Sequence, residues 1–598
     1  MPPLYFFQFF LFSLCVHIFT LFTYVAYYSD KLSSSCFSDF GKEYDYIIVG
    51  AGTAGSVIAH RLSTETNYTF IVLEAGGSSH PLYEIPVVGP FLQRSLYDWQ
   101  YETVSQEGAC LAMVDRKCRL PRGKIIGGSS KLNNMIHVRG NITHYSHWFH
   151  GKYSETYIKK QFTFIENELL YLNGIKYQSD LSKSILQAVN ELGFENIKSE
   201  FKIGFSESTL SQRAGKRWST SDNLKTTKKI LTHALVEKIL FNGNTAVGVN
   251  VDILGKSQQI YAKKGVILTA GAFNTPKILQ LSGIGPEKLL KSLNIPLVKN
   301  LPVGRNLQDH VATGVDLVLF NNSVSIESFD MINPFNLYKY FFEGVGPLTT
   351  PGCEVLGFVS TKDREIPDLQ YLVLPVGLAS DRGSLLKNSI NIKNDVWENY
   401  FIKSFDKSVA TILPVVLHPH SKGFVFINST DPKVPPIIDP KYLSDGEDIE
   451  ILINGLLLSK KIIETEAMRK LGAYLNPNKF PGCEHLDFFS NLYLECYVKH
   501  LTLASYHPIG TCSMGLPHSK NTVVDASFKI LGVERLFVAD ASVMPTLPSG
   551  NINAAVAMMA SIFFDANIGT KFGKIVAPVC FKLDLLFEYI YKICIINS

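Results

Sequence analysis

Several common functional signatures are missing from this 598-residue chain. Its ten cysteines include no CxxC pair and no HExxH motif occurs, so we expect no metal site. The chain has no GxSxG motif, which argues against hydrolase chemistry. Charged residues make up only 18% of the sequence, with a net charge of +4 and no lysine-rich run. We therefore expect no nucleic-acid partner.

Charge is also absent from the start of the chain. No Asp, Glu, Lys or Arg occurs between Pro2 and Ser29, a span long enough to cross a bilayer. A secretory signal usually has a basic n-region and a shorter apolar core, and this segment has neither. Three interpretations of residues 1–29 remain open: a cleaved signal peptide, an uncleaved signal-anchor, or a buried core helix.

The first two interpretations send the chain into the secretory pathway. We expect a secreted glycoprotein, with a membrane-anchored protein as the alternative if the segment is not cleaved. N-x-S/T triplets, which accept N-linked glycans, begin at Asn67, Asn141, Asn321 and Asn428. Cys110 and Cys118 are close enough in sequence to close a loop disulfide in an oxidising compartment, and two free thiols are the alternative.

The remainder of the sequence is rich in core-forming residues. Hydrophobic residues make up 46% of the chain, and its length predicts two or more folded domains. The apolar run at 46–49 is followed by Gly50, Gly52 and Gly55 and then by a helix-like segment. Such a strand, glycine turn and helix let a pyrophosphate approach the backbone at the positive end of the helix dipole.

An acidic residue completes this pattern. Glu74 ends the next apolar run, where a carboxylate accepts hydrogen bonds from the hydroxyls of an adenosine ribose. We therefore predict dinucleotide binding rather than a plain glycine-rich turn. The chain then leaves the repeated βαβ pattern typical of NAD enzymes, and a second small-residue turn follows at Gly127, Gly128, Ser129 and Ser130.

At this point the sequence resembles the glucose–methanol–choline (GMC) family of flavin oxidoreductases. The motifs that carry the resemblance are "GKIIGGSSKLN" (123–133), "GAFNTPKILQLSGIG" (271–285), "PVGRNLQDH" (302–310), "HPIGTCSMG" (507–515) and "VADASVMPTLPSGNINAA" (538–555). The likeness runs from about residue 44 to about residue 566, and the "CLAM…KCRLPRGK" segment is similar to the insect branch of glucose dehydrogenases, salicyl alcohol oxidases and ecdysone oxidases.

The resemblance implies an α/β fold in which an FAD-binding Rossmann-type domain is interleaved with a substrate domain built on an antiparallel sheet. Residues 44–150, 225–320 and 505–570 would form the FAD-binding domain, and residues 151–224 and 321–504 the substrate-binding domain. The C-terminal tail at 571–598 is unlike the family's ending, and an amphipathic docking helix is favoured there over a membrane anchor.

The resemblance also assigns contacts to the cofactor. Gly50, Gly52, Gly55 and Glu74 would hold the ADP half of FAD, and the backbone of Val236 would face the adenine. Asp540 would lie near the ribityl chain and pyrophosphate. The residues along the flavin would be Gly127, Gly128, Ser129 and Asn133. Leu132 stands where some relatives carry a histidine bonded to the flavin, so we expect non-covalent FAD.

The family's catalytic histidine corresponds to His507, which would take a proton from an alcohol while the flavin accepts a hydride. Asn553 would position the substrate oxygen. The expected reaction converts the CH–OH group of a small alcohol to a carbonyl, with oxygen or a quinone as electron acceptor. The sequence leaves open whether the alcohol is a sugar, an aromatic or a steroid. The alternative function is a catalytically silent paralogue that acts as a binding protein.

Overall fold

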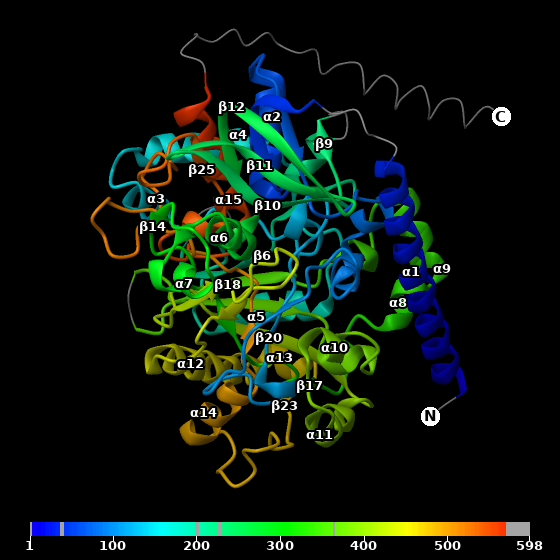
Figure 1. Ribbon diagram of the computed structural model, residues 1–598. Coiled ribbons are helices and arrows are strands. Elements are labelled where there is room, and N and C mark those ends of the chain that lie inside the picture. The colour runs from blue at the N-terminus through cyan, green and yellow to red at the C-terminus, as the bar shows by residue number, and fades with distance from the viewer. Residues whose placement is uncertain (1–2, 36–40, 198–201, 225–228, 363–364, 570–598) are drawn as a thin grey trace, which may run out of the picture.

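Two β-sheets organise the chain, one with a parallel centre and one antiparallel (Figure 1). The structure is a computed structural model that describes residues 3–35, 41–197, 202–224, 229–362 and 365–569. The C-terminal tail predicted at 571–598 lies outside these residues.

The first sheet has β1 at its centre. Its strands are β1 (Glu43–Val49), β2 (Phe70–Leu73), β9 (Ile230–Leu231), β10 (Ala234–Asn242), β11 (Thr245–Ile253), β12 (Lys256–Leu268) and β25 (Leu536–Val538). Strands β12, β1, β2 and β9 run parallel, β25 joins β12, and β10 and β11 extend the other edge in antiparallel order. Ile47 and Ile48 are fully buried because helices cover the parallel part.

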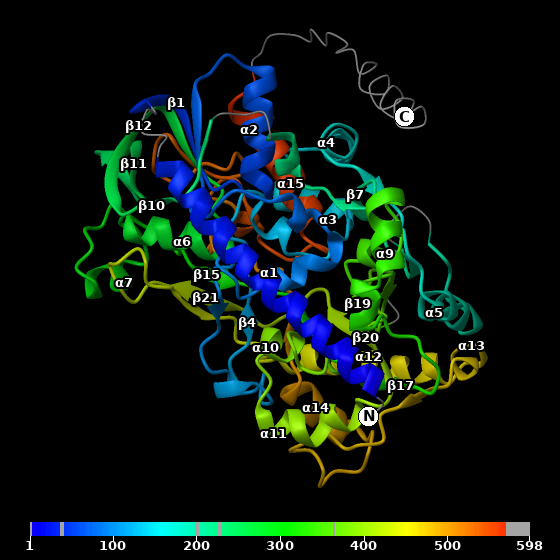
Figure 2. The ribbon, with the colours of Figure 1, turned by 90° about the vertical axis from the view of Figure 1, so that its right-hand side faces the viewer.

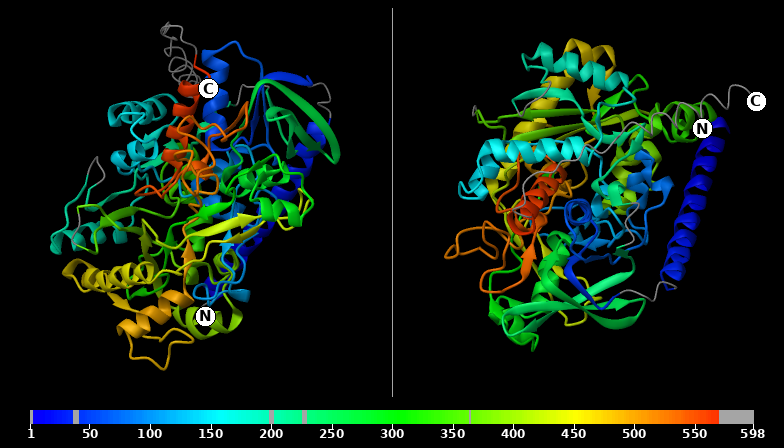
Figure 3. Two further views of the ribbon diagram at one scale, coloured as in Figure 1. Left: turned by 60° about the vertical axis from the view of Figure 1, so that its left-hand side comes forward. Right: turned by 90° about the horizontal axis from the view of Figure 1, so that it is seen from above.

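Two helices from opposite ends of the sequence cover this sheet. Helix α2 (Thr53–Glu65) follows β1 directly, and α15 (Asn553–Asn567) packs along it (Figure 3). The buried guanidinium of Arg61 joins them through a 2.8 Å ion pair to Asp565 and a 3.0 Å hydrogen bond to the carbonyl of Ser561. Helix α6 (Gly271–Leu281) lies beside β10.

The second sheet forms the other half of the molecule. Its strands are β6 (Gly204–Glu207), β16 (Val311–Ala312), β17 (Val318–Phe320), β18 (Val355–Val359), β19 (Leu369–Leu374), β20 (Ser408–Val416), β23 (Ala473–Leu475) and β24 (Leu503–Ala504). Helix α12 (Gly446–Ile463) packs on β20 and on α14 (Asn491–His500). The domain boundaries stay predictions, although β16 and β17 pair in this sheet and not in the first.

Two disulfides are present among the described residues. The predicted bond between Cys110 and Cys118 is formed, and Cys483 and Cys496 form a bond that the sequence did not predict. The sulfur atoms of the second pair lie near the ring of His500, but they are bonded to each other and so are not thiolate ligands for a metal.

The predicted glycosylation sites differ in their surroundings. Asn67, Asn321 and Asn428 are exposed, whereas Asn141 is half-buried. The side chain of Asn141 accepts a hydrogen bond from the backbone N–H of Thr143 and so caps α3 (Ile142–Trp148). The exposed sites are therefore the more accessible glycan acceptors.

The N-terminal segment forms one long helix, α1 (Pro3–Ser35). Residues Phe10–Ser33 are long and apolar enough to cross a membrane, with a mean hydropathy of 1.8. Only 11% of this stretch is buried, so the interpretation as a buried core helix is wrong. Figure 2 shows α1 lying across one side of the molecule.

Candidate active site

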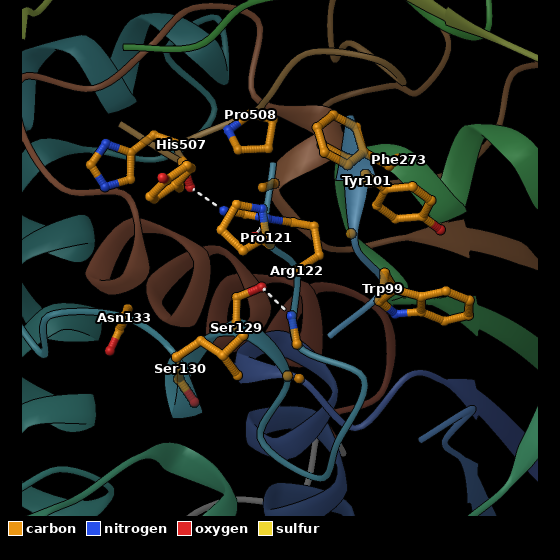
Figure 4. A pocket seen from close by; sticks show the side chains of 18 of the residues that line it. Trp99, Tyr101, Pro121, Arg122, Ser129, Ser130, Asn133, Phe273, His507 and Pro508 are labelled. Atoms are coloured by element: carbon orange, nitrogen blue, oxygen red, sulfur yellow. Dashed lines mark hydrogen bonds between the residues drawn. The ribbon is translucent and has the colours of Figure 1, made fainter. Parts of the chain in front are cut away.

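A cavity of about 450 Å³ lies between the two sheets. The ends of β1 and β2 and the first residues of α2, α6 and α15 line one part of it, and β19 and β20 line another. Figure 4 shows His507 and Asn133 on one side of the cavity and Trp99, Tyr101 and Phe273 on the other.

The glycines after β1 bring bare backbone to the cavity wall. Gly50 has a φ of +104°, and a Cβ there would lie 2.7 Å from the carbonyl oxygen of Thr269. Gly52 faces Gly128. A Cβ added to Gly128 would lie 3.0 Å from the Cα of Gly52. Gly55 is enclosed in α2, where a Cβ would lie 2.0 Å from the Gly50 carbonyl oxygen. Side chains are therefore disfavoured at Gly50, Gly55 and Gly128, and a ligand can approach the backbone of this turn.

Glu74 lies at the same end of the cavity. Its carboxylate accepts hydrogen bonds from the backbone N–H groups of Ala51 (2.8 Å) and Gly76 (2.9 Å). Burial nevertheless raises the pKa of Glu74 to about 7, because desolvation outweighs these bonds. Val236, on β10, also lines the cavity, near the end of β2 that Glu74 follows. The residues predicted for the ADP half of the cofactor therefore gather at one end.

The second small-residue turn runs along the cavity wall. Gly128, Ser129 and Asn133 line the cavity, whereas Gly127 lies behind the turn and donates its N–H to the Ala51 carbonyl (2.8 Å). The side-chain oxygen of Asn133 accepts from the buried Arg217 guanidinium at 2.8 Å. This bond fixes the Asn133 amide at the edge of the cavity.

Asp540 also lines the cavity, but its carboxylate is bonded within the protein. One oxygen accepts from the N–H of Gly271 (2.8 Å) and the hydroxyl of Thr275 (2.6 Å), and the other accepts from the N–H of Ser542 (2.8 Å). Asp540 therefore holds the first turn of α6 at the cavity. The positive ends of α2, α6 and α15 all meet there, which suits the anionic pyrophosphate of a dinucleotide.

His507 is anchored through its backbone. Its N–H donates to Asp309 at 2.7 Å, and the other oxygen of Asp309 accepts from the hydroxyl of Tyr442 at 2.7 Å. Burial raises the pKa of Asp309 to about 6, although the Tyr442 bond opposes this. Pro508 follows, and His507 lies outside any helix or strand.

A chain of hydrogen bonds fixes the tautomer of His507. Nε2 of His310 lies 3.0 Å from the carbonyl oxygen of Leu417, so this nitrogen carries a hydrogen. In neutral His310, Nδ1 is then an acceptor, and Nδ1 of His507, 2.9 Å away, must donate to it. The remaining nitrogen of His507, Nε2, keeps its lone pair and accepts from the side-chain amide of Asn551 at 3.2 Å.

Burial keeps both imidazoles neutral. Desolvation, with a smaller contribution from the Arg122 guanidinium, lowers the pKa of His507 to about 3. Desolvation and the neighbouring His507 and His418 lower the pKa of His310 well below its ordinary value. The tautomer chain therefore persists across the physiological pH range.

The partner of His507 is Asn551, so the predicted pairing with Asn553 is corrected. The side-chain oxygen of Asn551 accepts from the amide of Gln370 at 3.2 Å, which turns its nitrogen toward His507. The side-chain oxygen of Asn553 instead accepts from the hydroxyl of Thr53 at 2.7 Å, and Asn553 begins α15. Asn553 thus ties the first turns of α2 and α15 together.

Several residues of this site have no role that the sequence predicts. His310 ends the "PVGRNLQDH" motif and Arg122 belongs to the "KCRLPRGK" segment, so both were within recognised motifs. Gln370 lies within β19 and has no motif around it. Arg122 donates to the carbonyl of Tyr506 at 2.6 Å and lines the cavity beside His507 (Figure 4).

Family models agree with this geometry. The N-terminal model for GMC oxidoreductases matches residues 44–312, and the C-terminal model matches residues 419–560. The chain is a GMC oxidoreductase. The predicted family and fold class are thereby confirmed.

Curated relatives cover most of this GMC oxidoreductase. An ecdysone oxidase from Spodoptera littoralis is 31% identical over 557 residues, which is 88% of this chain and 91% of the relative. A glucose dehydrogenase (FAD, quinone) from Drosophila melanogaster is 32% identical over 568 residues, 89% of this chain and 87% of the relative. These relatives identify the protein as an FAD-dependent alcohol oxidoreductase, as predicted.

Solved structures share the fold. A pyridoxine 4-oxidase from Mesorbium loti has a TM-score of 0.72 and 26% identity, covering 87% of this chain and 98% of its own. A formate oxidase has a TM-score of 0.73 at 24% identity, and the match covers 88% of this chain and 98% of the formate oxidase chain. FAD is the cofactor of this GMC oxidoreductase, and the glycine turns, Glu74 and the helix ends described above fit it.

Proposed function

We propose that this GMC oxidoreductase oxidises the CH–OH group of an alcohol with a largely apolar body to a carbonyl, with Nε2 of His507 as the base. The observation that carries the proposal is the bond chain from Leu417 through His310, which leaves the lone pair of Nε2 directed at Asn551. A substrate hydroxyl between His507 and Asn551 would donate to Nε2 and accept from the asparagine amide.

The protein residues in this reaction have separate tasks. Bound FAD supplies the acceptor for the hydride that leaves the carbon. His507 accepts the hydroxyl proton, and Nδ1 of His310 continues to accept a hydrogen bond from the imidazolium that forms. Asn551 orients the substrate oxygen, and Gln370 keeps the Asn551 amide nitrogen on that side. The positive charge of Arg122 disfavours the protonated form of His507, which favours later release of the proton.

The wall of the cavity supports an apolar substrate. The residues that the second sheet and its loops contribute are mostly aliphatic: Val315, Leu372, Leu374, Val376, Leu378, Leu386, Ile390 and Leu413. The hydroxyl of Thr411 is also on this wall, but it donates to the Val376 carbonyl at 2.9 Å. A sugar would bring several hydroxyls to a wall that offers them few partners, which costs binding energy.

Flavin reduction tests the proposal directly. Purified holoenzyme under anaerobic conditions should lose its yellow colour on addition of an aromatic or steroid alcohol, and more slowly with glucose. Reoxidation with oxygen and then with a quinone dye identifies the acceptor. A yellow protein that no alcohol bleaches would instead indicate a silent binding paralogue.

We also propose that the flavin is held without a covalent bond. Leu132, on the cavity wall, offers no nucleophile for attachment. Acid precipitation should therefore release all of the flavin into the supernatant, and flavin that stays with the pellet would contradict this assignment.

A further inference from the structure

The inner face of α1 is seated on the enzyme by aromatic contacts. The ring centroid of Phe19 lies 6.3 Å from that of Tyr83, and the ring of Tyr27 lies 5.5 Å from that of Tyr97. Tyr83 and Tyr97 are buried and belong to a small hydrophobic cluster that also contains Ile125. The helix therefore completes a hydrophobic cluster of the folded enzyme.

A polar contact fastens the end of α1. The carboxylate of Asp30 accepts from the backbone N–H of Ser78 at 2.8 Å and pairs with Nε2 of His233 at 2.8 Å. His233 directly precedes the β10 residues that line the cavity. A segment removed during secretion has no need of such contacts, so they indicate that α1 remains part of the mature protein.

The outer face of α1 is an uninterrupted apolar stripe. Its exposed residues recur at intervals of three or four, and their exposed fractions range from 41% to 71%: Phe10, Leu14, Ile18, Leu21, Val25, Tyr28 and Leu32. Residues at this spacing share one face of a helix. In Figure 2 this helix lies uncovered at the front of the molecule.

A second apolar surface lies on the same side. Helix α8 (Ser328–Ile332) packs on α1, and α9 (Pro334–Tyr338) and a short π-helix (Lys339–Glu343) follow it (Figures 1 and 2). The exposed aromatic residues of this part, with exposed fractions of 54–77%, are Phe335, Tyr338, Phe341 and Phe342. We call them the α9 patch.

Basic residues border these surfaces. The ammonium of Lys339 lies 4.5 Å above the ring of Phe335, and Lys31 is exposed at the end of the stripe. Lys216 is also exposed, and its neighbour Gly215 lies against Gly344 at the end of the α9 patch. Exposed aromatics with lysines beside them suit the interface of a bilayer, where the rings enter the acyl boundary and the lysines meet lipid phosphates.

We propose that α1 is retained in the mature enzyme and lies along a lipid bilayer, its inner face on the protein and its outer stripe, with the α9 patch, in the lipid. Phe91, which packs on α1 at Phe19, is close in sequence to Gln93 on the cavity wall. The inner face of α1 therefore packs on the segment that contributes Gln93 to the cavity wall.

The test uses full-length holoenzyme purified in mild detergent. Intact mass should show that the α1 residues are retained, and the protein should float with phosphatidylcholine vesicles, more strongly when phosphatidylserine is added. Phe341→Glu combined with Phe342→Glu should lower the ratio of bound to free protein by about ten-fold or more, because two rings lose their burial in lipid. Leu516→Glu, at another exposed apolar residue, should float as the wild type does.

Three results would overturn the proposal: a mature N-terminus beyond residue 35, a wild-type protein that does not float, or a double variant that floats normally. The last would indicate that α1 spans the bilayer alone. Flavin reduction by alcohol in detergent should be the same in all variants, so loss of membrane binding is distinguished from failure of the proposed function.

Discussion

At the scale of single residues, the direction of the hydrogen bonds around His507 decides which of its nitrogens can accept a proton. The Leu417 carbonyl can only accept, so it fixes the hydrogen on Nε2 of His310 and, through it, the hydrogen on Nδ1 of His507. His310 is therefore a positioning residue that acts through His507.

We expect His310→Leu to slow flavin reduction by alcohol roughly ten- to hundred-fold, part of the gain that a positioned base supplies. The Nδ1–H of His507 loses its acceptor in this variant, so both tautomers become populated. His310→Gln, whose side-chain oxygen can accept the same hydrogen, should recover most of the rate. Stopped-flow measurement of flavin reduction in each variant checks this. Equal rates for the His310→Leu and His310→Gln variants would show that His310 does not act by fixing the tautomer of His507.

Substitution of Asn551, just before α15, and of Asn553, its first residue, should give different phenotypes. Asn551→Ala removes the amide beside Nε2, so reduction of bound flavin should slow by roughly ten- to hundred-fold. Asn553→Ala removes the bond to Thr53 and should lower the free energy of unfolding by about 1 kcal/mol with little change in the rate per bound flavin. The reverse pattern would restore the original assignment of Asn553.

The lowered pKa of His507 has a consequence for the pH profile. A histidine with a pKa of about 3 is unprotonated throughout the neutral range, so the base is available there. The rate of anaerobic reduction should therefore stay constant from pH 8 to pH 6.5, the ordinary histidine pKa, and fall only at lower pH. A decline that begins above pH 6.5 would contradict this.

A long motif surrounds His507, so its place on the cavity wall was predictable from the sequence, whereas Asn551 lies two positions before the asparagine that the sequence predicts. The segment "NIN" carries two asparagines, and only the start of α15 at Asn553 decides which one faces His507. Gln370 could not be found from sequence, because its role depends on how β19 passes behind the cavity. Residues that act through long-range packing leave little local pattern.

At the scale of elements, the contact between β1 and α2 limits what the first turn tolerates. A Cβ on Gly55 would lie 2.0 Å from the Gly50 carbonyl oxygen, so Gly55→Ala must push α2 away from β1. We expect this variant to be purified with little or no flavin. Gly446→Ala, at the start of α12 with no atom within 4 Å of the added carbon, should keep its full flavin content. The absorbance ratio of flavin to protein measures both.

The elements with strong local patterns were predicted well. The strand, glycine turn and helix at β1 and α2 are present where the sequence predicts them, and the Cys110–Cys118 bond is formed. The partner strands were not predictable in the same way. Strand β25 pairs with β12 across more than 250 residues, and such pairing follows from the whole fold and not from its own three residues.

At the scale of the whole molecule, the cofactor should act as a structural link between distant segments. The cavity is lined by residues from segments far apart in the sequence, so FAD bound in it would contact several of them. A ligand that binds only the folded state at about 100 times its Kd stabilises it by about 2.7 kcal/mol. Removal of FAD should lower Tm, and added FAD should raise it again in a concentration-dependent way. A Tm that does not change when FAD is removed or added would contradict this.

The pairing of α2 with α15 sets the order of events during synthesis. Thr53 bonds to Asn553 and Arg61 to Ser561, each across 500 residues. At about 5–20 residues per second, roughly 25–100 seconds pass between translation of the two helices. During this time the first glycine turn exists without the helix that closes its site, so cofactor loading follows translation. We therefore expect a chain truncated before α15 to be purified without flavin, however much of the fold precedes it.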